Sequence, residues 1–405
     1  MPSRRFHYAL FALLYFVQGS ALAYLRNFLK PFLDSQGIDV DVIGLFAGLL
    51  LIPFVLKIFI GMLSDRVNLL GYGHRKPYII IGLLGGALAF VIAAFMLPIT
   101  HFAPFAVLIL LGAFCVALFD STADGLAIDV TPMPEQGRVQ GVMVGSRAAG
   151  FIILSLVFGT MVQRQGQETV FLVIAATMVL PILLVVRLRE PASRSENQSF
   201  DKAAFAALRR PRFLLFAAFA VLYPITAYGI DGIVTLFMSS ELQVAETTIG
   251  QYGALRGFGA VIGAVLGGLL LDRIGRLTGS MAALLLITLT GLWLATAVQV
   301  NSILVIGFFW GIAWAFVETI FVALAMALAD TRIAASMFAL TMAISNIGVG
   351  IGESVATSLT DDIGFTAVFT LLALFNLVNF PILWRLFKIA PEIRLQSGKA
   401  GTAVY

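Results

Sequence analysis

Long apolar stretches follow one another along almost the whole chain. A helix needs roughly 20 mainly apolar residues to cross about 30 Å of hydrocarbon, and runs of this length are bounded here by Gly, Pro and charged residues. The short alternating segments of a membrane β-barrel do not occur in the sequence. We therefore expect an all-α polytopic membrane protein. The runs predict twelve membrane-spanning helices, at about 7–33, 41–63, 77–97, 103–129, 138–162, 168–188, 212–239, 247–271, 279–299, 302–328, 333–359 and 363–388.

The composition supports this fold class and narrows the functions. Of the 405 residues, 60% are hydrophobic and 12% are charged, which is far from the balance of a soluble domain. The formal net charge is +4, but the basic residues lie in short loops, so we expect contact with a lipid bilayer and no nucleic acid partner. The single cysteine, Cys115, excludes an internal disulfide framework, and without CxxC or HExxH patterns we predict no metal and no cofactor.

The distribution of Lys and Arg predicts the orientation in the membrane. With both termini in the cytoplasm, the inside segments contain twenty Lys and Arg residues, whereas the outside loops contain only Arg164. Positive residues favour cytoplasmic loops. We expect a multi-pass protein of the plasma membrane, the inner membrane in bacteria, with cytoplasmic termini and a monomeric state.

An internal repeat divides the chain into two halves. The sequence GMLSDR follows the second predicted span, and GLLLDR follows the eighth. Each motif therefore has the same place in its own group of six spans. The repeat predicts two six-helix halves with pseudo-two-fold symmetry: an N-terminal bundle at 1–188, a cytoplasmic linker at 189–211, and a C-terminal bundle with a short cytoplasmic tail at 212–405.

The second copy of the motif resembles a family signature. The pattern GxxxDRxGR is complete in GLLLDRIGR and is similar to the loop signature of the major facilitator superfamily, while the first copy has an insertion in GMLSDRVNLLGYGHRKPY. With LYFVQG, IGLFAGLLLIPFVLK and FDSTADGLAID, this longer form resembles the folate-biopterin transporters, the AmpG-type muropeptide permeases, their acetyl-CoA-transporter relatives and the bacteriochlorophyll-delivery proteins. MFALTMAISNIGVGIG looks most like the AmpG-type permeases.

The resemblance implies the major facilitator fold and a gating role for the two motifs. In this family the motif Asp contacts a neighbouring helix end and the arginines bind acids or carbonyls, which forms a latch that opens when the halves rock. The alternative is that Arg66 and Arg273 only anchor their loops in the cytoplasm. The expected gating residues are Gly61, Asp65, Arg66, Arg75, Gly268, Asp272, Arg273, Gly275 and Arg276.

Ionisable groups inside the predicted spans indicate an aqueous path. Each costs about 2.5 to 3.5 kcal/mol on insertion, so such groups usually face a cavity or a partner. They are Asp120, Asp124, Asp129, Arg147, Asp231, Arg256, Glu318 and Glu353. By depth, polar groups that also suit a cavity lining are Tyr15, Gln18, Tyr223, Trp314 and Asn346, although each suits contact with lipid or packing equally well.

Pairing among these groups is open at the sequence level. Asp120 and Asp124 lie one helical turn apart, and we expect an ion pair with Arg147 that either couples protons or only joins two spans. Asp129 is expected to form a structural pair with Arg138. The remaining basic residues near span ends are expected to anchor at the interface; they are Arg26, Lys30 and Lys57.

In the second half, Arg256 and Glu318 lie near mid-membrane, where the resemblance places a substrate site. A guanidinium group suits an anionic solute, and Glu318 is the predicted proton carrier because a carboxyl group away from water holds a proton more readily. A static pair between Arg256 and Glu318 is the alternative.

The sequence thus predicts a secondary active transporter that works by alternating access. The predicted partners are protons and a small organic solute, an anion or an amphipathic conjugate such as a muropeptide, a pterin or a siderophore-like compound. The alternative is a pigment-handling or assembly factor, because GHRKPYIIIG and TADGLAID are also similar to the bacteriochlorophyll-delivery proteins. No nucleotide-binding motif and no nucleophile-base pattern occur, so we expect neither ATP drive nor an enzyme.

Overall fold

The computed structural model describes residues 4–188, 190, 206, 209–297, 299–329, 334–390 and 393. These residues contain 12 helical segments long and apolar enough to cross a membrane, and no β-strand. The predicted all-α fold with twelve spans is confirmed. The segments are Arg4–Ser35, Val40–Arg66, Lys76–Ala94, Pro98–Val130, Arg138–Gln165, Gln167–Val185, Pro211–Ser240, Glu246–Leu271, Arg276–Leu294, Val300–Leu328, Ser336–Ile363 and Phe365–Ile389.

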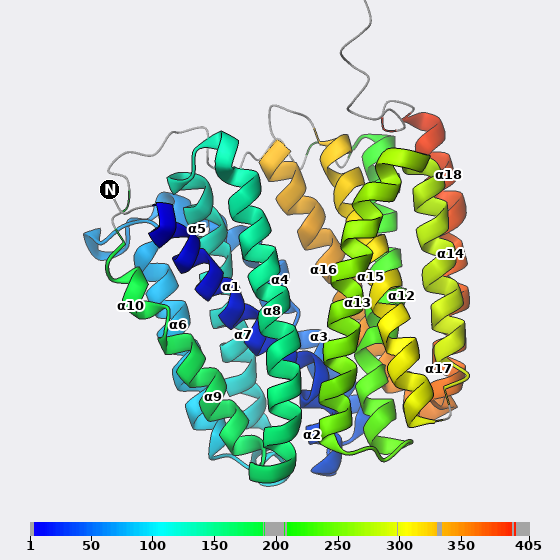
Figure 1. Ribbon diagram of the computed structural model, residues 1–405, viewed down its shortest axis with the longest axis horizontal. Helices are drawn as coiled ribbons and strands as arrows, with labels where there is room; N and C mark the ends of the chain where they lie inside the picture. Colours follow the sequence, from blue (N-terminus) through cyan, green and yellow to red (C-terminus); the bar gives the residue numbers. More distant parts are fainter. Residues whose placement is uncertain are drawn as a thin grey trace, which may run out of the picture. The chain divides into compact units, whose positions relative to one another are not determined.

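Several spans consist of more than one helix (Figure 1). The second span breaks twice, and its middle piece carries Pro53, which lacks a backbone N–H and favours a break. The helices of the first half are α1 (Arg4–Asn27), α2 (Leu29–Ser35), α3 (Val40–Leu49), α4 (Ile52–Val55), α5 (Lys57–Arg66), the 3-10 turn η1 (Leu69–Gly71), α6 (Lys76–Ala94), α7 (Pro98–Val130), α8 (Met133–Gln165), α9 (Gln167–Val179) and α10 (Ile182–Val185). The helices of the second half are α12 (Pro211–Ser240), α13 (Glu246–Ile274), α14 (Arg276–Leu294), α15 (Val300–Leu328), α16 (Ala334–Ile363), α17 (Phe365–Phe375), the turn η4 (Asn376–Val378) and α18 (Asn379–Ile389).

The chain folds into two compact units. Unit 1 consists of Met1–Phe200 and Thr235–Ala254, and unit 2 of Asp201–Val234 and Leu255–Tyr405. The segment Thr235–Ala254 therefore belongs to unit 1, although it follows the predicted linker. The division at 189–211 stays a prediction.

In unit 1, α1 lies along α8, and α6 packs against α7 and α9 (Figure 1). Two glycines bring the first pair into backbone contact: a Cβ atom on Gly19 would lie 2.1 Å from the Arg147 carbonyl oxygen, and one on Gly150 would lie 2.3 Å from that of Phe16. Small residues allow such an approach between membrane helices. The contact places Tyr15 of α1 and Arg147 of α8 at one interface.

Unit 2 repeats these helix pairings. Its α14 packs against α15 and α17, as α6 packs against α7 and α9. A Cβ atom on Gly348 of α16 would lie 2.2 Å from the carbonyl oxygen of Val221 in α12, so the first and fifth spans of this half also touch. Equivalent spans thus pair in the same way inside each unit, as a six-span repeat requires.

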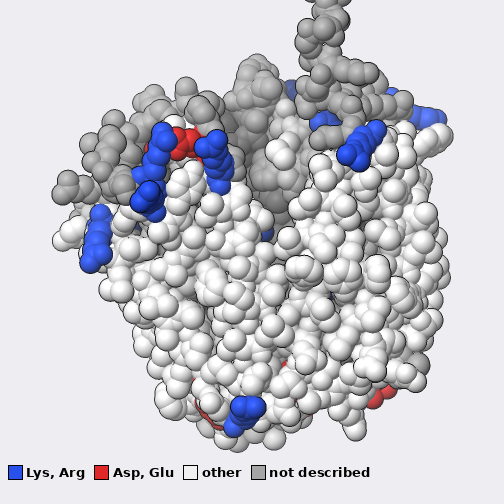
Figure 2. Space-filling view, in the orientation of Figure 1, with Lys and Arg blue, Asp and Glu red and all other residues white. Residues whose placement is uncertain are grey.

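The outer surface of the helices is apolar. Leu88, Val107 and Leu183 are among many large hydrophobic side chains that are more than half exposed. On the visible face in Figure 2, most Lys and Arg side chains lie near one end of the helices, beside a broad band almost without charge. Such a band is suited to the hydrocarbon of a bilayer.

Candidate functional site

Unit 1 contains a cluster of charged side chains between α1, α5 and α7, which we call the lysine cluster: Tyr15, Lys57, Asp120 and Asp124. The Nζ atom of Lys57 lies 2.6 Å from Oδ2 of Asp120 and 2.8 Å from Oδ2 of Asp124. The Tyr15 hydroxyl donates a hydrogen bond to Asp124. An ammonium group has three donors and no acceptor, so one lysine can serve both carboxylates.

The lysine cluster is buried at one side and open at the other. The side chain of Asp120 is 6% exposed and that of Asp124 is 37% exposed. A buried carboxylate needs a cation, because an unpaired charge in a low-dielectric interior is very costly. Asp120 is therefore the more deeply buried member of the pair, and Asp124 is the more exposed one.

The expected ion pair with Arg147 is wrong, and so is the expected interfacial anchoring of Lys57. Lys57 occupies the position between the two aspartates because α5 begins at this residue, directly after the break that follows Pro53. Its place inside an apolar run, several residues before Asp65 of the loop motif, is the sequence signal that was missed. Lys30, also expected at an interface, is buried.

Arg147 lies close enough to Tyr15 and Asp120 for its charge to act on both. Its side chain is exposed, and it makes no hydrogen bond or ion pair with the residues that the structure describes. The guanidinium group is therefore available to another anion.

Unit 2 contains a second cluster, the arginine cluster: Asp231, Arg256, Trp310 and Trp314. Arg256 donates two hydrogen bonds to Asp231, of 2.9 Å from Nε and 2.7 Å from a terminal nitrogen. Trp310 Nε1 donates to the same carboxylate at 3.0 Å. The guanidinium carbon lies 4.2 Å from the centre of the Trp314 ring, in the geometry of a cation–π contact. This planar, two-pronged recognition is specific to arginine.

Asp231 is a partner of Arg256 that was not expected from the sequence, and the alternative of a static pair between Arg256 and Glu318 stays a prediction. Glu318 accepts a hydrogen bond of 3.0 Å from the hydroxyl of Tyr223, which lies 3.4 Å from the Ser345 hydroxyl. Tyr223 is on the first span of its half and Glu318 is on the fourth. Tyr15 and Asp124 have the same places in the first half. Each unit therefore joins a tyrosine of its first span to a carboxylate of its fourth.

The other predicted path residues are mostly buried. Gln18 and Glu353 are 3% and 6% exposed, and Asn346 is half-buried. The Oε1 atom of Gln18 accepts no hydrogen bond from a described residue. Asn346 and Glu353 both interact with neighbouring groups.

The first copy of the loop motif, for which a gating role was expected, is built around Arg75. Arg75 is 4% exposed, and its guanidinium group contacts Asp65 at 2.6 Å, Asp129 at 3.0 Å and the Ser64 hydroxyl at 2.6 Å. The predicted pair of Asp129 with Arg138 is wrong, because the insertion in this loop brings Arg75 to Asp129. Gly125 leaves the room for it, since a Cβ atom there would lie 2.4 Å from the guanidinium carbon.

Glu190, in the segment that follows α10, contacts the same loop motif. It accepts hydrogen bonds from the backbone N–H groups of His74, at 2.8 Å, of Arg75, at 2.9 Å, and of Lys76. These groups stand at the N-terminus of α6, where a carboxylate is favoured by the helix dipole. Lys76 in turn donates to the carbonyl oxygen of Val186 at 2.6 Å. Glu190 lies far along the sequence from this loop, and no motif marked it.

The second motif has one matching contact. Arg276, the first residue of α14 as Lys76 is of α6, donates to the carbonyl oxygen of Ile393 at 3.1 Å. Gly275 has φ of +83°, which favours glycine. Arg66 and Arg273 are both exposed. A Cβ atom on Gly61 would lie 3.6 Å from the Ser121 hydroxyl, one on Gly268 would meet nothing within 4 Å, and the side chain of Asp272 lies outside the described residues.

Removing the carboxylate of Glu190 should loosen the start of α6. We expect Glu190→Ala to lower the free energy of unfolding by about 1 to 2 kcal/mol, because three N–H groups lose an acceptor, and Glu190→Gln to lower it by less. Denaturant unfolding of the protein in detergent measures both. Asp362→Ala, at an exposed acid of α16, is the control and should change stability by less than about 0.5 kcal/mol. Equal effects of Glu190→Ala and Asp362→Ala would contradict the capping role.

Family models match both halves of the chain. The BT1 family model matches residues 18–223, which is half of the chain. The chain belongs to the BT1 family. The Major Facilitator Superfamily model matches residues 220–403 of this BT1-family protein. The resemblance expected from the loop motifs is thereby confirmed.

The curated relatives of this BT1-family protein are transporters. It is 27% identical over 268 residues to a folate-biopterin transporter of Synechocystis sp., a match that covers 62% of this chain and 52% of the transporter. It is 25% identical over 364 residues to the anhydromuropeptide permease of Escherichia coli, which covers 84% of this chain and 71% of the permease. The chain therefore matches only about half the length of the first of these relatives.

Solved structures support the same fold. The crystal structure of the nucleoside transporter NupG is similar with a TM-score of 0.77 and 15% sequence identity, over 94% of this chain and 99% of that one. This BT1-family protein therefore has the major facilitator fold, and the part of the chain that the structure describes holds 12 helical segments long and apolar enough to cross a membrane.

Proposed function

We propose that this transporter carries an anionic organic solute by alternating access and couples its movement to protons. The observation that supports this most is the repeated contact of a tyrosine with a carboxylate, Tyr15 with Asp124 in unit 1 and Tyr223 with Glu318 in unit 2. In the proposal the protein works as a monomer in the plasma membrane, the bacterial inner membrane, with both termini in the cytoplasm.

The carboxylates are the proposed proton carriers. A carboxylate that accepts from a neutral tyrosine keeps its hydrogen bond when the proton arrives, because the phenol oxygen can accept as well as donate. Protonation of Glu318 would remove a charge that is costly in the membrane interior. Loss of that charge can change the free energies of the inward-open and outward-open conformations by different amounts. Such a difference in free energy is what shifts a conformational equilibrium.

The proposed solute class follows from the available cation. Arg256 is held by Asp231 and Lys57 by two aspartates, whereas the exposed Arg147 guanidinium contacts no described carboxylate. Guanidinium groups bind planar carboxylates and phosphates with two parallel hydrogen bonds. The two relatives are named for folate-biopterin and for anhydromuropeptide, so pterins and muropeptides are the first solutes to test.

Solute-driven proton flux in proteoliposomes is the direct test. With a pH dye inside the vesicles, folate, a pterin and an anhydromuropeptide should be compared at the same pH. For the active solute we expect Glu318→Gln to abolish proton flux and to retain exchange of labelled solute. Asp361→Asn, at an exposed acid of unit 2, should leave both unchanged. Proton flux that persists in Glu318→Gln would refute its role as carrier.

A second comparison tests the role of Arg147. Arg147→Gln should raise the KM roughly tenfold or more for an anionic solute, because one charge-assisted pair is lost, with little change for a neutral analogue. An equal rise for both would show that Arg147 only supports the fold. Pigment that co-purifies with the protein, with no flux for any solute, would instead favour the bacteriochlorophyll-delivery alternative.

A further inference from the structure

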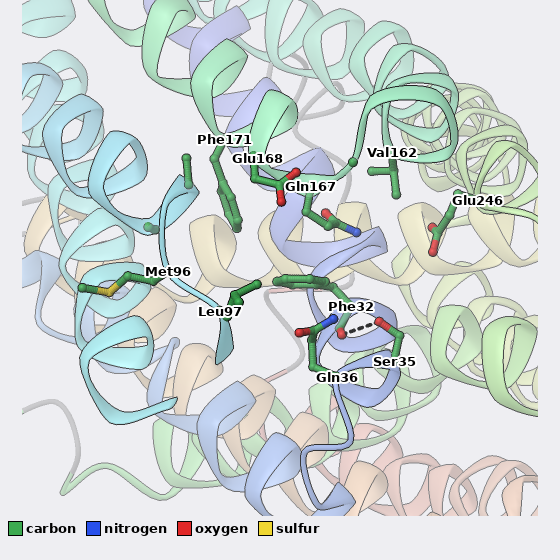
Figure 3. Close-up of a pocket in the computed structure, with 13 residues that line it drawn as sticks. Phe32, Ser35, Gln36, Met96, Leu97, Val162, Gln167, Glu168, Phe171 and Glu246 are labelled. Atoms are coloured by element: carbon green, nitrogen blue, oxygen red, sulfur yellow. Dashed lines mark hydrogen bonds between the residues drawn. The ribbon is translucent and has the colours of Figure 1, made fainter. Parts of the chain in front are cut away.

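Unit 1 contains a cavity of about 280 Å³ that the lysine cluster does not share (Figure 3). It lies where α6, α8 and α2 end and α9 and α13 begin. Phe32 in its lining is 17 residues after Tyr15, which is roughly 25 Å along α1 and α2 at 1.5 Å per residue. A ligand here would therefore be distant from Asp124.

The lining surrounds the cavity on four sides (Figure 3). Gln167 and Glu168 lie on one side with Phe171, and Phe32 and Gln36 face them. Met96 and Leu97 close one end and Glu246 lies at the other. The walls are thus mostly apolar, with amide and carboxylate groups at a few places, as in many small-molecule sites.

Two oxygen atoms of this lining lack a hydrogen-bond donor. Oε1 of Gln167 and Oε2 of Glu246 are buried, and neither accepts a hydrogen bond from the described part of the chain. An unsatisfied buried acceptor costs about 1 to 3 kcal/mol. Ser35 in the lining is not a donor to either oxygen, because its hydroxyl donates to the carbonyl oxygen of Phe32 at 2.7 Å.

The charge of the lining is negative. Glu168 and Glu246 both line the cavity, and none of the described lining residues is Lys, Arg or His. Both acids stand in the first turns of helices, where the dipole favours them. The dipole explains their presence, but it supplies no donor to the buried oxygen of Glu246. A cationic group with N–H donors would both balance the negative charge of the lining and donate a hydrogen bond to Glu246.

The aromatic side chains favour an organic cation. The Phe171 ring lies 6.4 Å from that of Phe32 and 4.8 Å from that of Tyr24, so the cavity wall is held by a packed aromatic group. Aromatic faces attract ammonium ions, and they also receive an apolar body. In the described part of the chain no cluster of three His, Cys, Asp or Glu residues could hold a metal ion.

We propose that this cavity is a binding site for a small organic ammonium ion with an aromatic or short aliphatic body. The ammonium group donates to Glu246 and to the amide oxygen of Gln167, and the apolar body packs on Phe32 and Phe171. The site does not depend on the proposed transport cycle.

Calorimetry on the full-length protein in nanodiscs tests the site, with phenethylammonium as the probe. 2-Phenylethanol, which has nearly the same shape without charge, is the matched probe and should bind at least tenfold more weakly. We expect Glu246→Gln to weaken phenethylammonium roughly tenfold or more, and Glu168→Gln to weaken it less. Glu241→Gln removes the same charge at an exposed position five residues earlier and should have no effect.

Any of three results with the probes and the glutamate variants would overturn the proposal. They are equal binding of the two probes, equal loss in Glu241→Gln and Glu246→Gln, and displacement of phenethylammonium by Ca²⁺ at lower concentration. Size-exclusion profiles show whether each variant is folded, and Phe171→Leu, which keeps both acids, gives a second test through a weaker but measurable affinity. Loss of binding in Asp124→Asn with retention in Glu246→Gln would place the probe in the lysine cluster instead.

Discussion

Lys57→Met is expected to lower the free energy of unfolding by about 3 kcal/mol and to abolish transport. Its ammonium group contacts Asp120 and Asp124 at once, and Asp120 is almost fully buried. Removing one partner of a buried ion pair leaves an uncompensated charge, which costs more than the pair itself contributes. Denaturant unfolding in detergent gives the stability, and solute uptake by proteoliposomes gives the activity.

A second substitution separates charge from packing in this result. The double variant Lys57→Met with Asp120→Asn removes one cation and one buried anion, so we expect it to recover about half of the lost stability. Lys388→Met, at an exposed lysine that lies over Trp384, is the control and should cost less than about 1 kcal/mol. A double variant less stable than Lys57→Met would show that the lysine stem, and not its charge, supports the fold.

Arg75→Met is expected to have a similarly large effect, about 3 to 4 kcal/mol. The guanidinium group contacts two carboxylates and a hydroxyl while it is 4% exposed. Arg75→Lys keeps the charge but loses the planar arrangement of donors, so about 1 to 2 kcal/mol should be lost. Thermal and denaturant unfolding both measure this order.

The neighbouring Arg66 is the matched control. It ends the same helix that holds Asp65, but it is exposed. We expect Arg66→Met to change stability by less than about 0.5 kcal/mol. Transport by Arg66→Met then tests the gating role predicted for both arginines. Stability losses of equal size in the two methionine variants would contradict the assignment of Arg75 as the centre of the motif.

The twelve spans could be predicted because crossing hydrocarbon is a local requirement on length and polarity. The predicted span at 77–97 agrees with Lys76–Ala94 within a few residues, and the twelfth at 363–388 with Phe365–Ile389. The break at Pro53 also has a local cause. The face of α5 that points into the unit depends on how α3, α4 and α5 are joined and packed. This packing involves other helices, so it cannot be inferred from the local sequence.

The partners of the buried charges could not be predicted for this reason. Arg147 on the adjoining span was expected from the sequence as the partner of Asp120 and Asp124, and Lys57 was expected at an interface. For Arg256 the sequence suggested Glu318, and Asp231 was not considered. In each case the choice depends on the rotation of the helices about their axes, which glycine contacts such as that of Gly19 with Arg147 determine in three dimensions.

The assignment of Thr235–Ala254 to unit 1 agrees with close packing at the start of α13. A Cβ atom on Gly250 would lie 2.5 Å from the Ser155 carbonyl oxygen, and one on Gly253 would lie 2.3 Å from the side-chain amide nitrogen of Asn27. Any side chain larger than hydrogen at either glycine would therefore force this segment away from α1 and α8.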